Sequence, residues 1–441
     1  MSNISLSELE EWDQKICEIA KSYGLDWYPI AYETINFHEM IGAMAYHGLP
    51  SHYSHWSYGK TFERTRTRYN AGLEGLPYEL IINSNPSIAY LMLENDLYLQ
   101  VLIMAHCVGH SDFFKNNRTF KDTDAATAVM RFKNAKNRIQ KYIEDPSIGI
   151  EEVEKILDAC HAVSYQTDRR GRTRLSEKEL RQKYAIIVND SEKEKWKNFD
   201  LERIPLEPEY DVLLFILENN KDLHDWQKDI INIVREESQY FWPQIRTKVM
   251  NEGWASFWHY RILHDLQLPD HLHIPFIKSH NSVIRPTMGS INPYHVGFEI
   301  FKDIEERFGL EECFFARENF NDESFIRQYL TKEKANDLGL FTYGKVSRKN
   351  KDVIVKDVLD DTEDSWIEIK KALIGHVAGN KIPVIYVDRM EKDKTLILCH
   401  EHDGRDLELD YADNCVQLLK NIWNGNVILN TIIEEEPFEV S

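Results

Sequence analysis

The spacing of hydrophobic positions divides the chain into two parts. From Met1 to about Leu340, apolar and aromatic residues recur every three to four positions in long segments, which is the period of an amphipathic helix. The clearest of these segments are residues 211–219, 226–242 and 244–266. We therefore predict a mainly α-helical domain over residues 1–340.

From about Tyr343 the pattern changes to short runs rich in β-branched residues, separated by polar turns such as Asp403-Gly404 and Asn424-Gly425. The runs cover residues 352–358, 383–387, 395–399 and 427–433, with helical patterns over 366–378 and 410–423 between them. Short runs with such turns are typical of the strands of an antiparallel sheet. Residues 343–441 thus predict a small α+β domain, and the whole chain an α+β fold.

Three local patterns refine the helical part. The first 16 residues predict an acidic amphipathic helix, with Ser7 as its N-cap and Glu10 as the capping-box partner. The pair Asn85-Pro86 predicts the start of a helical region, because proline is favoured in the first turn of a helix. The charged segment 166–208 predicts an exposed excursion from the helical domain.

Composition narrows the class of protein. The chain has 441 residues with 53 Lys+Arg against 73 Asp+Glu, a formal net charge of −20, which argues against nucleic acid as the main partner. Six scattered cysteines without a CxxC pair favour a reduced, intracellular compartment. Neither a signal-peptide pattern nor an apolar stretch long enough for a transmembrane segment is visible in the sequence, so we expect a cytoplasmic protein.

Two histidines carry the first half of a metal-site pattern. His106 and His110 are four residues apart in the apolar segment 98–114. On a helix their rings stand on one face and can bind one metal ion. Inside an apolar helix, two imidazoles otherwise need other buried polar partners.

The second half of the pattern is the segment 251–260, Asn-Glu-Gly-Trp-Ala-Ser-Phe-Trp-His-Tyr. It resembles the Asn-Glu-Gly-aromatic-Ala-Ser-aromatic helix of gluzincin metallopeptidases, in which the glutamate is the third zinc ligand after an HExxH helix. The resemblance implies a site for Zn²⁺, or another divalent metal, at His106, His110 and Glu252 with an open position for water. His259 lies seven residues after Glu252 on the same helical face and can approach the metal or a substrate.

Two departures from the gluzincin pattern leave the catalytic base open. Cys107 stands where those enzymes carry the glutamate that activates water, and a thiol does not replace a carboxylate base. Glu252 also lies 142 positions after His110, which requires an insertion between them. Other residues that can reach the water are, by position in the sequence, Glu236, Glu237, His295 and Glu299.

Several longer blocks resemble the SpoVR family, the stage V sporulation protein R-like proteins of bacteria. The blocks are residues 54–60 (Ser-His-Trp-Ser-Tyr-Gly-Lys), 78–84 (Tyr-Glu-Leu-Ile-Ile-Asn-Ser), 105–117, 239–256 and 291–294 (Ile-Asn-Pro-Tyr). The family implies a cytoplasmic protein that is linked, in spore formers, to assembly of the peptidoglycan cortex of the spore. Relatives in bacteria that do not form spores look connected with a serine-kinase-like AAA+ protein and a von Willebrand-type partner. No biochemical activity follows from membership.

The zincin-like arrangement also implies a place for substrate. Residues 78–83, with Tyr78, Glu79 and Asn83, would be the edge strand beside the metal, where zincins pair with an extended substrate. His55, in an aromatic-rich loop with His52, would line the cleft.

Two functions of different classes remain open. The first is a zinc-dependent hydrolase that acts on a peptide-like or amide substrate, a cell-wall precursor or a protein. The second is a catalytically inactive zincin-like scaffold that binds protein partners in a sporulation or stress-response assembly. The clustered histidines favour the hydrolase, and Cys107 favours the scaffold.

Overall fold

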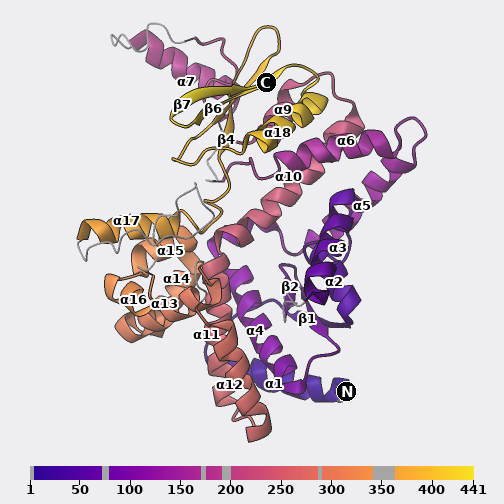
Figure 1. The fold of residues 1–441 in the computed structure, drawn as a ribbon. Coiled ribbons are helices and arrows are strands. Elements are labelled where there is room, and N and C mark those ends of the chain that lie inside the picture. Colours follow the sequence, from indigo (N-terminus) through magenta and orange to yellow (C-terminus); the bar gives the residue numbers. More distant parts are fainter. Residues whose placement is uncertain (1–3, 72–78, 170–174, 191–199, 287–290, 341–362) are drawn as a thin grey trace. The chain divides into compact units, whose positions relative to one another are not determined.

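The computed structural model describes residues 4–71, 79–169, 175–190, 200–286, 291–340 and 363–441 (Figure 1). Backbone contacts group the chain into two units, each built from two separate segments. The first unit contains Met1–Asn134 and Pro243–Lys381, and the second contains Ala135–Trp242 and Ile382–Ser441. The helices α5 (Ala128–Glu144) and α10 (Asp225–Arg246) each contribute residues to both units.

The first unit combines a small sheet with long buried helices. Its strands β1 (Ile30–Ile35), β3 (Ser87–Met92) and β2 (Leu80–Ile82) lie in that order, with β1 parallel and β2 antiparallel to β3. The core helices are α1 (Leu6–Ser22), α4 (Leu97–Asn116), α11 (Lys248–Asp265) and α13 (Pro293–Phe308). Around them lie α2 (Phe37–Ala45), α3 (Trp56–Asn70), the 3₁₀ turn η1 (Arg118–Thr123), α12 (Asp270–Val283), α14 (Leu310–Asn319), α15 (Asp322–Tyr329), α16 (Lys332–Asp337) and α17 (Glu363–Ile374).

The centre of this unit is the packing of α4 against α11. Every residue of α4 from Leu99 to Phe114 is buried, as expected for a helix that is apolar on all sides and surrounded by others. Helix α11 packs on α4 and α13, and α12 also contacts α4 (Figure 1). The fully buried aromatic side chains Trp254, Phe257 and Trp258 of α11 fill this core. The sequence segments proposed to hold metal therefore lie on two contacting core helices.

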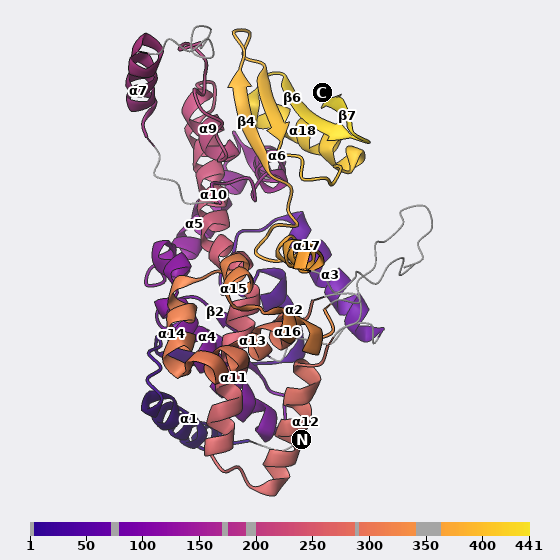
Figure 2. The ribbon, with the colours of Figure 1, turned by 90° about the vertical axis from the view of Figure 1, so that its left-hand side faces the viewer.

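The second unit carries the larger sheet. Strands β4 (Ile385–Met390), β5 (Leu396–His400), β6 (Val427–Ile433) and β7 (Glu436–Val440) lie in that order, and α18 (Leu409–Trp423) packs on β6 and on α6 (Gly149–Ala162) (Figure 2). The described part of this unit also contains the helices α7 (Glu177–Asp190) and α9 (Val212–Asn219).

The α+β class is confirmed, with a mainly helical first part and a small C-terminal sheet. The predicted antiparallel C-terminal sheet is confirmed for the pairs β4–β5 and β6–β7, but it is wrong for β5 and β6, which run parallel. The connection between them contains α18, which returns the chain to the same end of the sheet. Strand β7 was missed, since the run of glutamates before it resembles a solvent-exposed turn. The predicted strand 352–358 lies outside the described residues.

Two local predictions at the start of the chain are also wrong. The N-cap of α1 is Ser5, whose hydroxyl accepts a hydrogen bond from the backbone N–H of Glu8. Residues 87–92 form β3 in the middle of the sheet, and the helix begins only at Leu97. The apolar run of β3 is six residues long, and periodicity does not separate so short a run from a helix.

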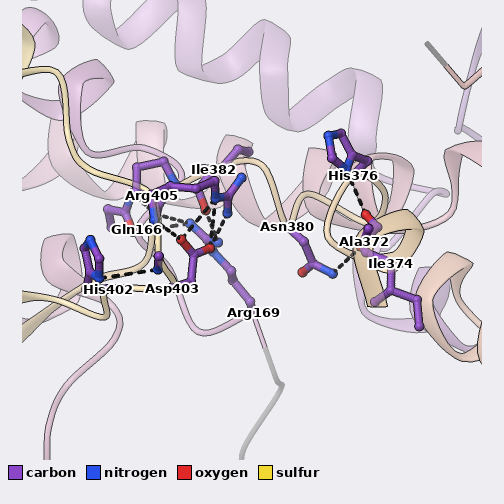
Figure 3. Close-up of polar contacts among 12 residues, drawn as sticks. Gln166, Arg169, Ala372, Ile374, His376, Asn380, Ile382, His402, Asp403 and Arg405 are labelled. Atoms are coloured by element: carbon purple, nitrogen blue, oxygen red, sulfur yellow. Dashed lines mark hydrogen bonds and ion pairs between the residues drawn. The ribbon is translucent and has the colours of Figure 1, made fainter. Parts of the chain in front are cut away.

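The segment expected to leave the domain at residue 166 is anchored instead. The side chain of Gln166 is buried, donates to the carbonyl of Pro383 and accepts from the N–H of Ile385. The guanidinium of Arg169 donates to the carbonyls of Ile382 and Pro383 (Figure 3). These contacts lie at the start of β4, so Gln166 and Arg169 do not belong to an exposed excursion.

The predicted boundary between residues 340 and 343 stays a prediction, because residues 341–362 lie outside the described part of the chain. The C-terminal strands share a unit with residues 135–242. None of the described helices has the length and apolar character of a membrane span.

Candidate metal centre

Helices α4 and α11 present three polar side chains to one another inside the apolar core. The rings of His106 and His110 lie one turn apart on α4, with centroids 4.5 Å from each other. Gly109 lies against Ala255, so close that a Cβ on this glycine would lie 2.7 Å from the Cα of Ala255. Because the helices approach closely here, Glu252 of α11 reaches both imidazoles: its Oε2 is 3.4 Å from His110 Nε2 and 3.8 Å from His106 Nε2.

A fourth side chain, that of Glu79, comes from the residue directly before β2. Glu79 Oε1 lies 3.4 Å from His106 Nε2. One ligand atom from each of Glu79, His106, His110 and Glu252 lies within 4.8 Å of the other three. Two neutral imidazoles and two carboxylates are ligands that zinc accepts, and their summed charge balances a divalent cation. These four residues can therefore hold a metal ion.

Two atoms of this cluster lack hydrogen bonds, and its two carboxyl groups have shifted pKa values. His106 Nε2 and Glu252 Oε2 are buried and make no hydrogen bond, and buried polar atoms without partners are rare in proteins. Burial and the neighbouring Glu252 raise the pKa of Glu79 to about 7. Burial acts in the same direction on Glu252, but the two imidazoles outweigh it and lower its pKa below the usual value.

Each imidazole of the cluster is supported through its other nitrogen. His110 Nδ1 lies 2.8 Å from the amide oxygen of Asn251, and His106 Nδ1 lies 2.7 Å from His259 Nδ1. A histidine that binds metal through Nε2 carries its proton on Nδ1 and needs an acceptor there. The partners of both Nδ1 atoms come from α11, the helix that also supplies Glu252.

Tyr294, in the first turn of α13, contacts two residues of the cluster. Its hydroxyl donates to Glu79 Oε1 at 3.4 Å, and its ring stacks beside His106 with centroids 6.1 Å apart. Asn292 positions it as the N-cap of α13, accepting from the N–H of Tyr294. Burial raises the pKa of the Tyr294 hydroxyl well above its usual value, so the group is a hydrogen-bond donor.

The family profile described as "SpoVR like protein" matches residues 3–382. The chain belongs to the SpoVR family. It is also 38% identical over 406 residues to "Uncharacterized protein YcgB" of Escherichia coli (strain K12), an alignment that covers 82% of this chain and 76% of that relative. No solved structure matches the chain. The resemblance to the SpoVR family is thus confirmed.

The structure of this SpoVR-family chain brings His106, His110 and Glu252 together, and adds Glu79, which the sequence analysis assigned to substrate. Sequence reasoning missed Tyr294 as a site residue, although the Asn-Pro-Tyr block that contains it carries an N-cap signal. Cys107 lies outside the cluster and is fully buried in the apolar core. Burial raises the pKa of its thiol well above the usual range.

The proposed catalytic residues occupy different places. His259 lies behind His106, with both ring nitrogens in hydrogen bonds. His295 follows Tyr294 on α13, where burial lowers its pKa. The side chain of the neighbouring alternative Glu299 pairs with Lys334. Glu236 and Glu237 lie on α10 within the second unit, whereas the metal cluster belongs to the first.

The remaining substrate candidates have structural contacts. His55 is the N-cap of α3, where Nδ1 accepts from the N–H of Ser57. Asn83 is fully buried and donates to the hydroxyl of Thr123. Tyr78 lies outside the described residues. Substrate binding by these residues stays a prediction.

Proposed function

We propose that this SpoVR-family protein is a metal-dependent hydrolase that cleaves a peptide or amide bond with Zn²⁺ held by His106, His110 and Glu252. The observation that carries the proposal is a pair of buried atoms without a hydrogen bond, His106 Nε2 and Glu252 Oε2, which converge with His110 and Glu79. When bound, zinc polarises a carbonyl group and lowers the pKa of a water molecule.

Glu79 is the residue best placed to accept the proton of that water. The three proposed zinc ligands lie on α4 and α11, whereas Glu79 lies on neither helix. Cys107 is not a candidate for this role, because its fully buried side chain packs in the apolar core. The Tyr294 hydroxyl donates its one hydrogen to Glu79 and so orients this carboxylate.

The proposed cellular role rests on membership of the SpoVR family. We propose a cytoplasmic role in sporulation, with a precursor of the spore-cortex peptidoglycan or a protein as substrate. The serine-kinase-like AAA+ protein and the von Willebrand-type protein are the proposed partners, and nucleic acid is not among them.

Elemental analysis of the purified full chain tests the metal site. We expect about one zinc per chain, lost in His106→Ala, His110→Ala and Glu252→Gln while circular dichroism stays unchanged. His271→Ala is the matched control, because His271 is exposed on α12. Glu79→Gln should keep the metal and lose hydrolysis of peptidoglycan fragments or peptides. A wild-type chain that takes up no divalent metal contradicts the proposal.

The second candidate function is a scaffold without catalytic activity, favoured by Cys107 at the position of the zincin glutamate. The two functions predict different genetics. If the protein is a hydrolase, the Glu79→Gln and His106→Ala variants should fail to restore the wild-type phenotype in a deletion strain. If it is a scaffold, both variants restore it and still bind the two partner proteins.

A further inference from the structure

Three buried histidines from three helices form a hydrogen-bonded row that begins at the metal cluster. His106 Nδ1 lies 2.7 Å from His259 Nδ1, and His259 Nε2 lies 2.7 Å from His280 Nδ1. The three rings come from α4, α11 and α12 and are at most 2% exposed. No other residue separates them, so the row is a direct imidazole–imidazole–imidazole contact.

Each contact in this row needs one proton, because one nitrogen must donate and the other must accept. The protons of neutral rings can therefore be arranged in two ways. In the first, His106 donates to His259 and His259 donates to His280, which leaves the lone pair of His106 Nε2 free for the metal. In the second, both donations are reversed, His106 carries its proton on Nε2, and the metal position is blocked.

Aromatic side chains pack against the rings of His259 and His280 and hold them in the geometry that this row requires. The ring of His280 lies between Tyr260, at a centroid distance of 4.7 Å, and Phe298, at 5.2 Å. His259 contacts Phe276 edge-on, with centroids 6.4 Å apart. Burial keeps water from replacing either ring as a hydrogen-bond partner, so the orientation of His106 depends on these two histidines.

The second metal histidine is supported differently. His110 Nδ1 faces the amide oxygen of Asn251, which can only accept. His110 is therefore held in the metal-binding tautomer at all times, whereas the tautomer of His106 depends on the row behind it. The two metal histidines therefore differ in what fixes their tautomer, and the tautomer decides whether Nε2 can bind metal.

We propose that His259 and His280 are positioning residues that hold His106 in its Nδ1–H tautomer and thereby set the affinity of the centre for its metal ion. This inference rests on the metal-binding function proposed above. It assigns His259 to the support of a ligand and not to contact with substrate, and it adds His280 as a residue of the site.

Substitutions that keep or remove the acceptor test this role. His259→Asn offers an amide oxygen near the position of Nδ1, as Asn251 does for His110, whereas His259→Phe fills the space without an acceptor. Zinc affinity of the full chain, measured by competition with a chromophoric chelator, should fall about ten- to a hundred-fold in His259→Phe. It should stay within a few-fold of wild type in His259→Asn and in the control His271→Ala.

A spectroscopic measurement separates positioning from a general loss of structure. In the zinc-loaded wild-type chain labelled with ¹⁵N-histidine, we expect the proton on Nδ1 of His106 and on Nε2 of both His259 and His280. Equal losses of affinity in His259→Asn and His259→Phe, or the proton of His259 on Nδ1, would overturn the inference. The protonation of each histidine nitrogen can also be measured in the zinc-free chain, even if the wild type binds no zinc. The absence of a metal site and the absence of the proposed proton arrangement are therefore distinguishable.

Discussion

Gly253 of α11 and Gly297 of α13 are in backbone contact. A Cβ on Gly253 would lie 2.8 Å from the backbone nitrogen of Phe298 and closer still to Gly297 itself. A Cβ on Gly297 would lie 2.7 Å from the Cα of Gly253. Since Glu252 directly precedes one glycine and Tyr294 lies one turn before the other, this contact sets how closely two residues of the site approach.

The first prediction concerns this contact. Gly253→Ala and Gly297→Ala should each destabilise the protein by about 3 kcal/mol or more, because backbone and not a flexible side chain occupies the space of the new methyl group. Gly59→Ala on α3 is the control, since Gly59 is exposed with no atom in the way and the change should stabilise by about 0.5–1 kcal/mol. Urea unfolding measures all three, and a Gly253→Ala chain as stable as Gly59→Ala would contradict this packing.

Removal of the metal should lower the thermal stability of chains with an intact metal site, but not of chains that lack a metal ligand. A ligand that binds only the folded state stabilises it by about 2.7 kcal/mol at one hundred times its Kd. We therefore expect a chelator to lower the thermal unfolding midpoint of the wild-type chain, and added zinc to restore it. His106→Ala should unfold at the same temperature with and without chelator, whereas His271→Ala should respond as wild type does.

Sequence periodicity was sufficient for elements whose pattern is local. The segments predicted at 211–219, 226–242 and 244–266 correspond to α9, α10 and α11 within a few residues. The spacing of His106 and His110 also places both rings on one face of α4, as the helical period requires. In these cases the information lies within a few turns of one helix.

Contacts between distant segments could not be predicted in this way. Glu79 joins the cluster from the position directly before the three-residue strand β2, and nothing in its own neighbourhood in the sequence indicates that it faces His106. The row from His106 through His259 to His280 connects three helices whose order in space is set by packing. The parallel pairing of β1 with β3 depends in the same way on segments more than 50 residues apart.

The buried thiol next to the first metal histidine should have no part in the chemistry. Cys107 is fully buried in the core of the first unit, so Cys107→Ala should keep its zinc and cost about 1–2 kcal/mol of stability. Cys107→Glu, which restores the HExxH pattern in the sequence, should instead place an unpaired carboxylate in the core and unfold the chain. Zinc content and solubility of the two variants measure this, and loss of zinc from a folded Cys107→Ala chain would contradict it.

The last prediction concerns the start of the helix that carries Glu252. Asp322 is fully buried, and its carboxylate accepts hydrogen bonds from the backbone N–H groups of Val249 and Met250 at 2.9 and 2.8 Å. The N-cap residue of α11, Thr247, makes no capping bond with its own side chain. Asp322 therefore satisfies two N–H groups of the first turn that would otherwise be buried without a partner.

Removal of this carboxylate should affect both stability and the metal. Asp322→Ala should cost about 1–3 kcal/mol, because each buried N–H loses its acceptor, and Asp322→Asn should cost less, because one acceptor oxygen remains. Zinc affinity should fall together with stability, since Glu252 follows on the next turn. The adjacent Glu323→Ala is the control: Glu323 pairs with Arg327 at the surface, and the loss of such a pair changes stability by less than about 1 kcal/mol. Equal urea midpoints for Asp322→Ala and Glu323→Ala would show that α11 does not depend on this cap.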